Sequence, residues 1–132
     1  MSDFRKTQMW RKAHALTLNV DRLAKGICGS QRVSLRVQMV RAAMSIPTNI
    51  VEGTSQRTAK EYARFVRIAL NSASELEYHL LLAHDVHAIN ANEFEALSYQ
   101  TIEVRKMLYG RFRHLGNKQF PAKGTDGPAA VP

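Results

Sequence analysis

Residues 58–87 decide the fold class of this chain: they are TAKEYARFVRIALNSASELEYHLLLAHDVH and contain neither Gly nor Pro. Thr58 and Glu61 have the spacing of a capping box, in which each side chain bonds to the other's backbone N–H. An uninterrupted helix of about 30 residues is about 45 Å long. Its buried face is predicted from a repeat of three and four positions: Tyr62, Phe65, Ala69, Ala73, Leu76, Leu80, Ala83 and His87.

Three further helices are predicted on either side of this stretch. Their boundaries follow from capping residues before each apolar repeat and from glycines after it. The predicted helices cover residues 7–25, 34–52 and 92–116. Ser34 and Asn92 are the expected N-caps of the last two, and Gly53 and Gly116 are their expected stops. Pro47 lies inside the second helix, where it removes one backbone donor and predicts a kink.

Four amphipathic helices joined by short turns predict an all-α fold, an antiparallel up-down-up-down four-helix bundle. This domain is expected to cover residues 1–116. The remaining residues, 117–132, are rich in Gly, Pro and Ala and are predicted to form a disordered tail.

Length and composition fit one domain outside the membrane. The chain has 132 residues, of which 45% are hydrophobic, enough for one packed core. No apolar run approaches the length of a membrane span, and the N-terminus lacks the apolar segment of a signal peptide. Cys28 is the only cysteine, which excludes a disulfide within the chain. We therefore expect a cytoplasmic protein that makes no membrane contact.

Positive charge is concentrated in the first half of the chain. The formal net charge is +8, and residues 1–67 contain 13 Lys or Arg against 4 Asp or Glu. Residues 68–132 contain 6 against 7. Such a field favours an anionic partner, most often RNA or DNA. An ordinary basic surface that keeps the protein soluble fits the same counts, so charge alone leaves both interpretations open.

One group of cations has the spacing of a single helical ridge. Steps of three, four and three separate Arg57, Lys60, Arg64 and Arg67. Further cations are expected near this ridge: Arg36, Arg41, Arg11 and Lys12. Regularly spaced cations suit a phosphate backbone, whose contacts position a protein without selecting a sequence. The alternative is a face that only meets solvent.

The second helix has more apolar surface than one core requires. Its first apolar face comprises Leu35, Met39, Ala42, Ala43, Ile46 and Ile50. A second stripe, about 130° around the helix, comprises Val37, Val40, Met44, Pro47 and Val51. A monomeric bundle would leave that stripe in water. We favour a subunit interface formed by Val37, Val40, Met44 and Val51 over a helix that is merely central in its bundle.

No residue pattern predicts catalysis or a cofactor. His84 and His87 could share a helix face, but no Glu is followed three positions later by His, as di-iron bundles require. Ser72 and Ser74 lie in mid-helix without the glycine-rich elbow of a nucleophile. Glycine-rich phosphate loops are absent from the sequence. We expect no metal site, no cofactor and no enzymatic activity.

Residues 38–53, QMVRAAMSIPTNIVEG, resemble the signature of the four helix bundle protein family, or 23S ribosomal RNA intervening-sequence proteins, a group similar to ribosomal protein S23. A second segment resembles that family through Tyr62, Phe65, Ala69, Ser72, Glu75 and Leu76. Trp10 resembles its early tryptophan, and the likeness covers residues 7–115. The sequence departs from the pattern at Val40, where Arg is common, and at Asn71, where Gly is common.

The resemblance implies a homopentameric bundle without an attached enzymatic activity. Distant relatives include accessory proteins of diversity-generating retroelements, which implies RNA, DNA or a nucleic-acid-processing protein as a partner. A protein-interaction scaffold with no direct role in nucleic-acid binding is the alternative.

Within the shared motif, Ser45, Asn49, Glu52 and Glu75 are expected to form a polar network between helices. Each acid is assumed to lie in apolar surroundings, where it needs a hydrogen-bond donor.

Overall fold

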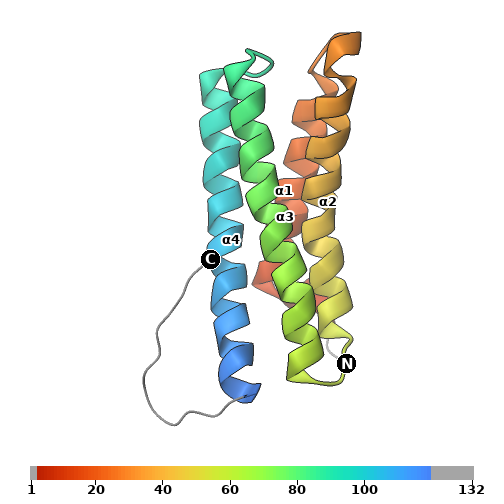
Figure 1. Cartoon of the computed structure of the whole chain (residues 1–132), viewed down its shortest axis with the longest axis vertical. Coiled ribbons are helices and arrows are strands. Elements are labelled where there is room, and N and C mark those ends of the chain that lie inside the picture. Colours follow the sequence, from red (N-terminus) through yellow and green to blue (C-terminus); the bar gives the residue numbers. More distant parts are fainter. Residues whose placement is uncertain (1–2, 120–132) are drawn as a thin grey trace.

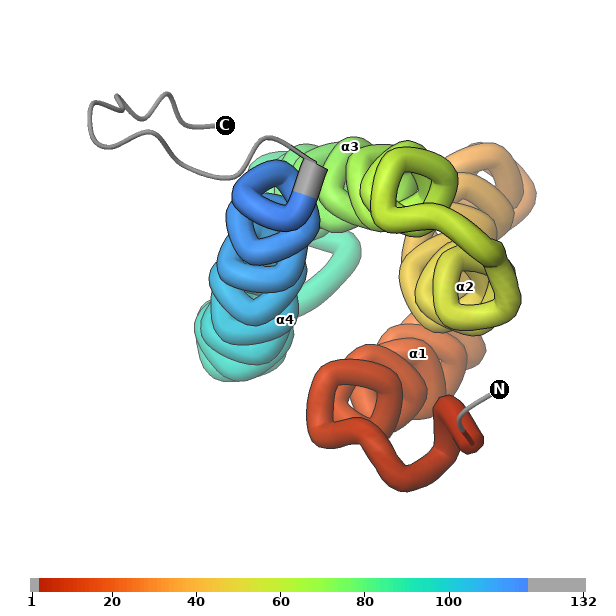
Figure 2. The backbone as a smooth tube through the Cα atoms, turned by 90° about the horizontal axis from the view of Figure 1, so that it is seen from below, coloured from red at the N-terminus to blue at the C-terminus, as the bar shows by residue number. Residues whose placement is uncertain are grey.

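Four long α-helices and two short 3-10 helices make up the computed structural model, which describes residues 3–119. In chain order these are η1 (Phe4–Lys6), α1 (Gln8–Lys25), η2 (Ser30–Arg32), α2 (Val33–Thr54), α3 (Ala59–Asp85) and α4 (Ala91–Gln119). Successive α-helices run in opposite directions (Figure 1). Each packs against the next, and α1 also packs against α4, so that α1 and α3 lie at opposite corners (Figure 2). The predicted antiparallel four-helix bundle is confirmed.

Side-chain caps begin three of the four α-helices. Thr7 Oγ1 accepts from Trp10 N–H at 3.2 Å, and Thr58 Oγ1 accepts from Glu61 N–H at 3.1 Å. Before α4, Asn90 Oδ1 accepts from Glu93 N–H at 2.8 Å while Glu93 Oε1 accepts from Asn90 N–H at 2.9 Å. Both bonds of a capping box are therefore present at Asn90.

Two predicted N-caps are wrong. Asn92 lies in the first turn of α4, because Asn90 forms the capping box with Glu93. Ser34 lies inside α2, which continues directly from η2 without a side-chain cap at Arg32. The 3-10 turn before α2 thus takes the place of a capping side chain at the start of this helix.

Helix α3 ends at a left-handed residue that is not glycine. His87 has a φ of 62° and is exposed, so its predicted place in the buried face of α3 is wrong. The backbone N–H of His87 donates to His84 O at 3.0 Å, and that of Ala88 donates to Ala83 O at 2.8 Å. This bond pair is the Schellman motif, which satisfies the last carbonyls of a helix and turns the chain.

The predicted glycine stops do not end their helices. Helix α2 includes Gly53, and α4 passes Gly116 to reach Gln119. Residues 117–119 of the predicted tail therefore continue the helix, and the rest of that tail lies outside the described residues. Pro47 lies within α2 as expected, and the kink remains a prediction.

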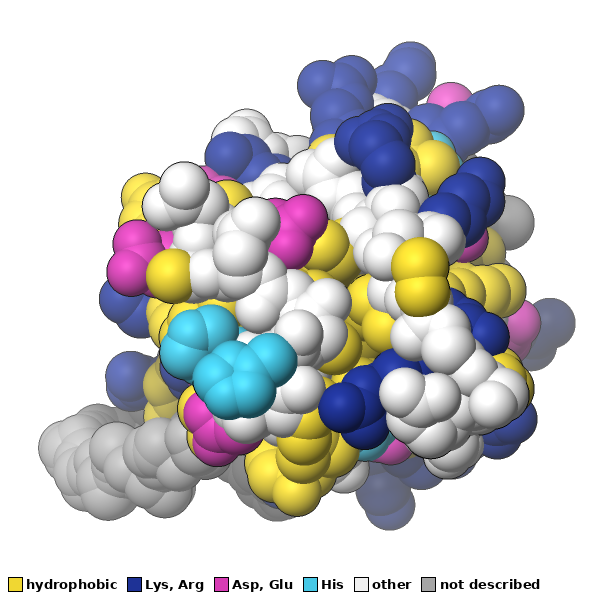
Figure 3. Space-filling model, turned by 90° about the horizontal axis from the view of Figure 1, so that it is seen from above, with side chains coloured by type: hydrophobic (Ala, Val, Ile, Leu, Met, Phe, Trp, Pro, Cys, Tyr) yellow, Lys and Arg dark blue, Asp and Glu magenta, His cyan; other side chains and the backbone are white. Residues whose placement is uncertain are grey.

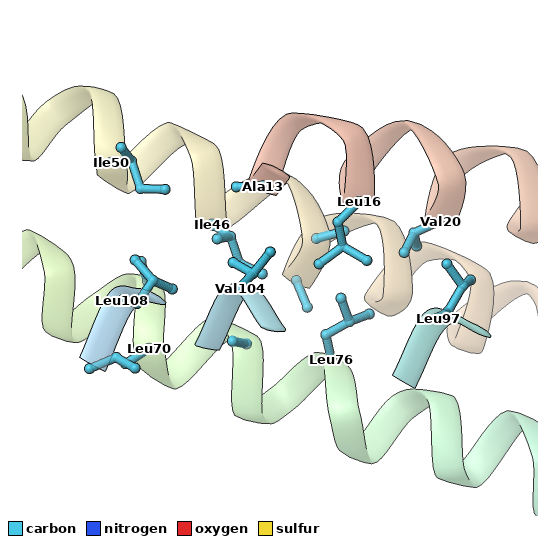
Figure 4. Close-up of a cluster of buried hydrophobic side chains, with 14 of the residues drawn as sticks. Ala13, Leu16, Val20, Ile46, Ile50, Leu70, Leu76, Leu97, Val104 and Leu108 are labelled. Atoms are coloured by element: carbon cyan, nitrogen blue, oxygen red, sulfur yellow. The ribbon is translucent and has the colours of Figure 1, made fainter. Parts of the chain in front are cut away.

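Apolar side chains from all four α-helices meet in one core (Figure 4). Its largest fully buried members are Leu16, Met39, Ile46, Ile50, Leu76, Leu80 and Leu108. Polar pairs line the seam between α1 and α4, where Lys12 Nζ lies 3.0 Å from Glu103 Oε2 and Asn19 Nδ2 donates to Gln100 Oε1 at 2.9 Å. Within residues 3–119, no helix is both long enough and apolar enough to cross a bilayer.

Candidate nucleic-acid interface

The bundle has one strongly basic end, where α2 and α4 finish and α3 begins (lower end in Figure 1). Seven of its cations come from α3, the turn before α3, and α4: Arg57, Lys60, Arg64, Arg67, Arg111, Arg113 and Lys118. Within residues 48–67 and 109–118, two carboxylates accompany these seven cations, Glu52 and Glu61. Helix α1 also begins at this end, where residues 3–12 add four Lys or Arg and one Asp. We call these seven cations the basic end.

The other end carries both signs of charge. Residues 21–36 and 84–95 contain four Lys or Arg and four Asp or Glu. Seen from above, His side chains lie beside Asp and Glu on the left of the surface, while Lys and Arg lie mainly to the right (Figure 3). The excess positive charge is therefore polarised along the bundle axis.

The predicted ridge is exposed at the basic end. All four side chains, Arg57, Lys60, Arg64 and Arg67, are exposed. Arg64 Nε lies 3.1 Å from Glu61 Oε1. This surface pair has little effect on stability and leaves the guanidinium accessible. Arg67 reaches towards α4, where its guanidinium carbon lies 4.8 Å from the centroid of the Phe112 ring.

Arg111 brings a further charge from α4 towards α3. Burial raises the pKa of Tyr62 above its ordinary value, and the positive charge of Arg111 acts in the opposite direction. Arg111, Arg113 and Lys118 were absent from the ridge predicted from sequence. The predicted up-down topology could have identified these three cations, because it places the end of the fourth helix beside the start of the third.

Arg36 and Arg41 do not join the ridge. Arg36 Nη1 donates to the carbonyls of Ile27 and Gly29 at 2.7 and 3.2 Å, so this side chain holds the connection between α1 and α2 at the other end. Arg41 is exposed, but about 17 Å of helix separates it from Glu52, at the level of the ridge.

Arg11 and Lys12 are also outside the ridge. Both belong to α1, at the corner opposite α3, and Lys12 is paired with Glu103. The expectation that these α1 and α2 cations extend the ridge is wrong, because Arg36 and Arg41 lie farther along the bundle axis and α1 lies at the corner opposite α3.

The second apolar stripe of α2 is exposed in part. Val37 and Met44 have 48% and 52% of their surface accessible, and Val33 extends the stripe with 46%. Val40 and Val51 are half-buried, whereas Pro47 is buried within the chain. We call Val33, Val37, Val40, Met44 and Val51 the α2 stripe.

Comparison with known proteins gives the family. A family model described as 23S rRNA-intervening sequence protein matches residues 5–110. The chain belongs to this family. A crystal structure from Bacteroides thetaiotaomicron, of a protein with unknown function from the S23 ribosomal protein family, shares the fold with a TM-score of 0.75. That match has 24% sequence identity and covers 80% of this chain and 98% of the other. No curated protein matches the sequence.

In this member of the 23S rRNA-intervening sequence protein family, hydroxyls connect α2 to α3. Ser45 Oγ and Ser72 Oγ lie 2.6 Å apart across the two helices. Asn49 Nδ2 donates to Ser45 Oγ at 3.1 Å and to Ser45 O at 2.8 Å. Glu52 and Glu75 are exposed, so their predicted place in a buried network is wrong. The polar contacts that this motif makes between α2 and α3 therefore involve only uncharged side chains.

Gly53 allows α3 to approach α2 closely. A Cβ at this position would lie 2.8 Å from Tyr62 Cδ1 and 3.2 Å from Phe65 Cβ. Both contacts are shorter than ordinary van der Waals separation. The glycine of the family motif is therefore a site of helix packing, because only its missing side chain leaves room for Tyr62.

A residue of α1 compensates for Pro47. Because proline has no N–H, the carbonyl of Ala43 loses its usual donor four residues later. Thr17 Oγ1 lies 3.0 Å from this carbonyl and 2.9 Å from Ala13 O, so its hydroxyl is within hydrogen-bond distance of both acceptors. The sequence gives no indication of this role for Thr17, because a helical repeat carries no information on a backbone acceptor in another helix.

The histidines do not assemble a metal site with acids or the cysteine. Within the described part of the chain, no three His, Cys, Asp or Glu side chains are grouped so as to hold an ion. His84 instead stacks on Phe94, with 4.7 Å between ring centroids, and its Nδ1 lies 3.6 Å from Asp85 Oδ1.

Proposed function

We propose that this protein is a homo-oligomeric module that binds nucleic acid through its basic end and catalyses no reaction. One observation carries the proposal: α3, the turn before it and α4 bring together seven Lys or Arg, with two carboxylates within residues 48–67 and 109–118. A concentrated cationic surface attracts a polyanion and releases the counterions condensed on it. The family description names 23S rRNA, so RNA is the first ligand to test and DNA the second.

Binding through this surface depends on phosphates and is independent of sequence. Arg57, Lys60, Arg64 and Arg67 are exposed along one line of α3 and its preceding turn. Contacts from such side chains to phosphate oxygens fix position on a strand but do not distinguish bases. A nucleic-acid-processing protein that works on the same strand is a natural further partner.

The partly exposed α2 stripe supports the homo-oligomeric part of the proposal. Val37 and Met44 expose about half of their surface in the single chain, and a second copy would remove this apolar area from water. The family resemblance implies five copies. A symmetric assembly repeats the basic end, and several weak contacts on one strand then add to a useful avidity.

The test is a salt series on two double variants. Arg64→Ala with Arg67→Ala removes two cations of the ridge, whereas Arg22→Ala with Lys25→Ala removes two exposed cations from the opposite end. Because each phosphate contact contributes about 0.7–0.9 to the slope of log K against log salt, the ridge variant should lower that slope by about 1.5. Its affinity should fall alike for unrelated sequences, and the control should retain the wild-type slope.

Circular dichroism checks that both variants keep their helices. A ridge variant with wild-type affinity and slope would show that these cations only meet solvent. Failure of the wild-type protein to bind RNA or DNA at low salt would favour the protein-interaction scaffold.

A further inference from the structure

Three arginines at the basic end lie over aromatic rings. The guanidinium carbon of Arg64 is 4.5 Å from the centroid of Phe65, and that of Arg67 is 4.8 Å from the centroid of Phe112. That of Arg113 is 6.0 Å from the centroid of Tyr109. The rings are half-buried and the three arginines are exposed. We call these three pairs the arginine–aromatic cluster.

The cluster has properties that phosphate binding alone does not require. A lysine ammonium group carries the same charge as a guanidinium, and the ridge itself includes Lys60. Arginine differs in being planar, so that it stacks on a ring and leaves its other face free. Attraction to the ring also restricts the guanidinium before any ligand arrives, which lowers the entropy lost on binding.

The spacing of the cluster suits consecutive bases. Arg64 and Arg67 are three residues apart in α3, which is about 4.5 Å along the helix axis. Nucleotides follow one another at a rise of about 3.4 Å in a stacked strand. The helix therefore presents these two arginines at a spacing similar to that of neighbouring bases.

We propose that the arginine–aromatic cluster stacks unpaired bases, so that the protein prefers single-stranded RNA over duplex; this rests on the proposed nucleic-acid binding. A duplex hides the faces of its bases and offers mainly phosphates to a protein surface. A single strand offers phosphates and base faces together, and stacking tolerates every base because each has a π-face. The preference is therefore for strandedness, without selection of sequence.

Three probes of equal length separate stacking from charge. They are a mixed-sequence RNA strand, the same strand annealed to its complement, and an abasic strand with the same number of phosphates. At one salt concentration, the wild-type protein should bind the single strand at least about tenfold more tightly than the abasic strand. The duplex should resemble the abasic strand, after correction for its second set of phosphates.

Arg64→Lys with Arg67→Lys keeps the charge and removes the planar group. This variant should bind the single strand about tenfold more weakly, with unchanged affinity for the abasic strand and an unchanged salt slope. Arg22→Lys is the control, because Arg22 is exposed at the opposite end of the bundle and loses the same planar group. The control should bind all three probes as the wild type does.

Some results would refute base stacking alone, and others would refute nucleic-acid binding as a whole. Equal affinity for the single strand and the abasic strand, or wild-type binding by the double lysine variant, would refute base stacking and leave binding through phosphates intact. Absence of binding to every probe at low salt would refute the proposed function together with the stacking.

Discussion

Replacing Gly53 with Ala tests the close contact between α2 and α3. In a helix, Ala is favoured over Gly by about 1 kcal/mol at interior positions, and by less near an end. At position 53 the new Cβ would lie 2.8 Å from Tyr62 Cδ1 and 3.2 Å from Phe65 Cβ. Overpacking of this kind costs about 1–3 kcal/mol, because rings and backbone must shift. We therefore expect Gly53→Ala to destabilise the protein by about 1 kcal/mol.

Gly110→Ala is the matched control for this substitution. Gly110 lies within α4, and a Cβ there would meet no atom within 4 Å. The helix preference then acts alone, and we expect stabilisation by about 1 kcal/mol. The same chemical change should thus have opposite signs at two helical positions, with about 2 kcal/mol between the variants.

Urea unfolding followed by circular dichroism measures this difference. Both variants should be compared at one protein concentration, because self-association would make apparent stability depend on concentration. A difference of about 2 kcal/mol corresponds to several degrees in Tm. If Gly53→Ala were as stable as Gly110→Ala, this result would contradict the close approach of Tyr62 to α2.

Three further variants test other features of the structure. His87→Gly should stabilise the protein by about 0.5–1 kcal/mol in urea unfolding, because glycine adopts a positive φ without steric cost; a loss of stability would contradict this C-cap. Thr17→Val should destabilise it by about 1–3 kcal/mol, since the Ala43 carbonyl would lose the hydroxyl donor that compensates for the adjacent proline; unchanged stability would show that this bond is unimportant. Val40→Glu with Met44→Glu should reduce the mass in light scattering to the 14.9 kDa of one chain, because the interface would bury unpaired charge. A wild-type mass of one chain at micromolar concentration would refute self-association through the α2 stripe.

The sequence by itself determined the number of helices, their order and most of the core. Apolar residues at steps of three and four define a buried face within each helix, and this information is local. The Thr58 cap followed for the same reason, since it depends on residues within one turn. Short connections then left an antiparallel bundle as the natural packing. Boundaries were less accurate, because Asn90 and Asn92 are both good capping residues with an acid three residues later, and only the structure shows that Asn90 pairs with Glu93.

Tertiary structure alone decided what lies opposite each residue. Gly53 resembled a helix stop in the sequence, and its contact with Tyr62 shows that the glycine makes room for another helix. Glu52 and Glu75 were expected among apolar residues but face solvent. The repeat within one helix does not show which of its residues a neighbouring helix covers.

The basic end shows the same limit of prediction from sequence. Its ridge on α3 was visible as a spacing of cations, whereas the contribution of α4 depends on two segments that lie far apart in the chain. The Arg67 guanidinium meets the Phe112 ring only after both helices are packed. Periodicity gives the direction in which a side chain points around its own helix, and packing supplies the atoms that it meets there.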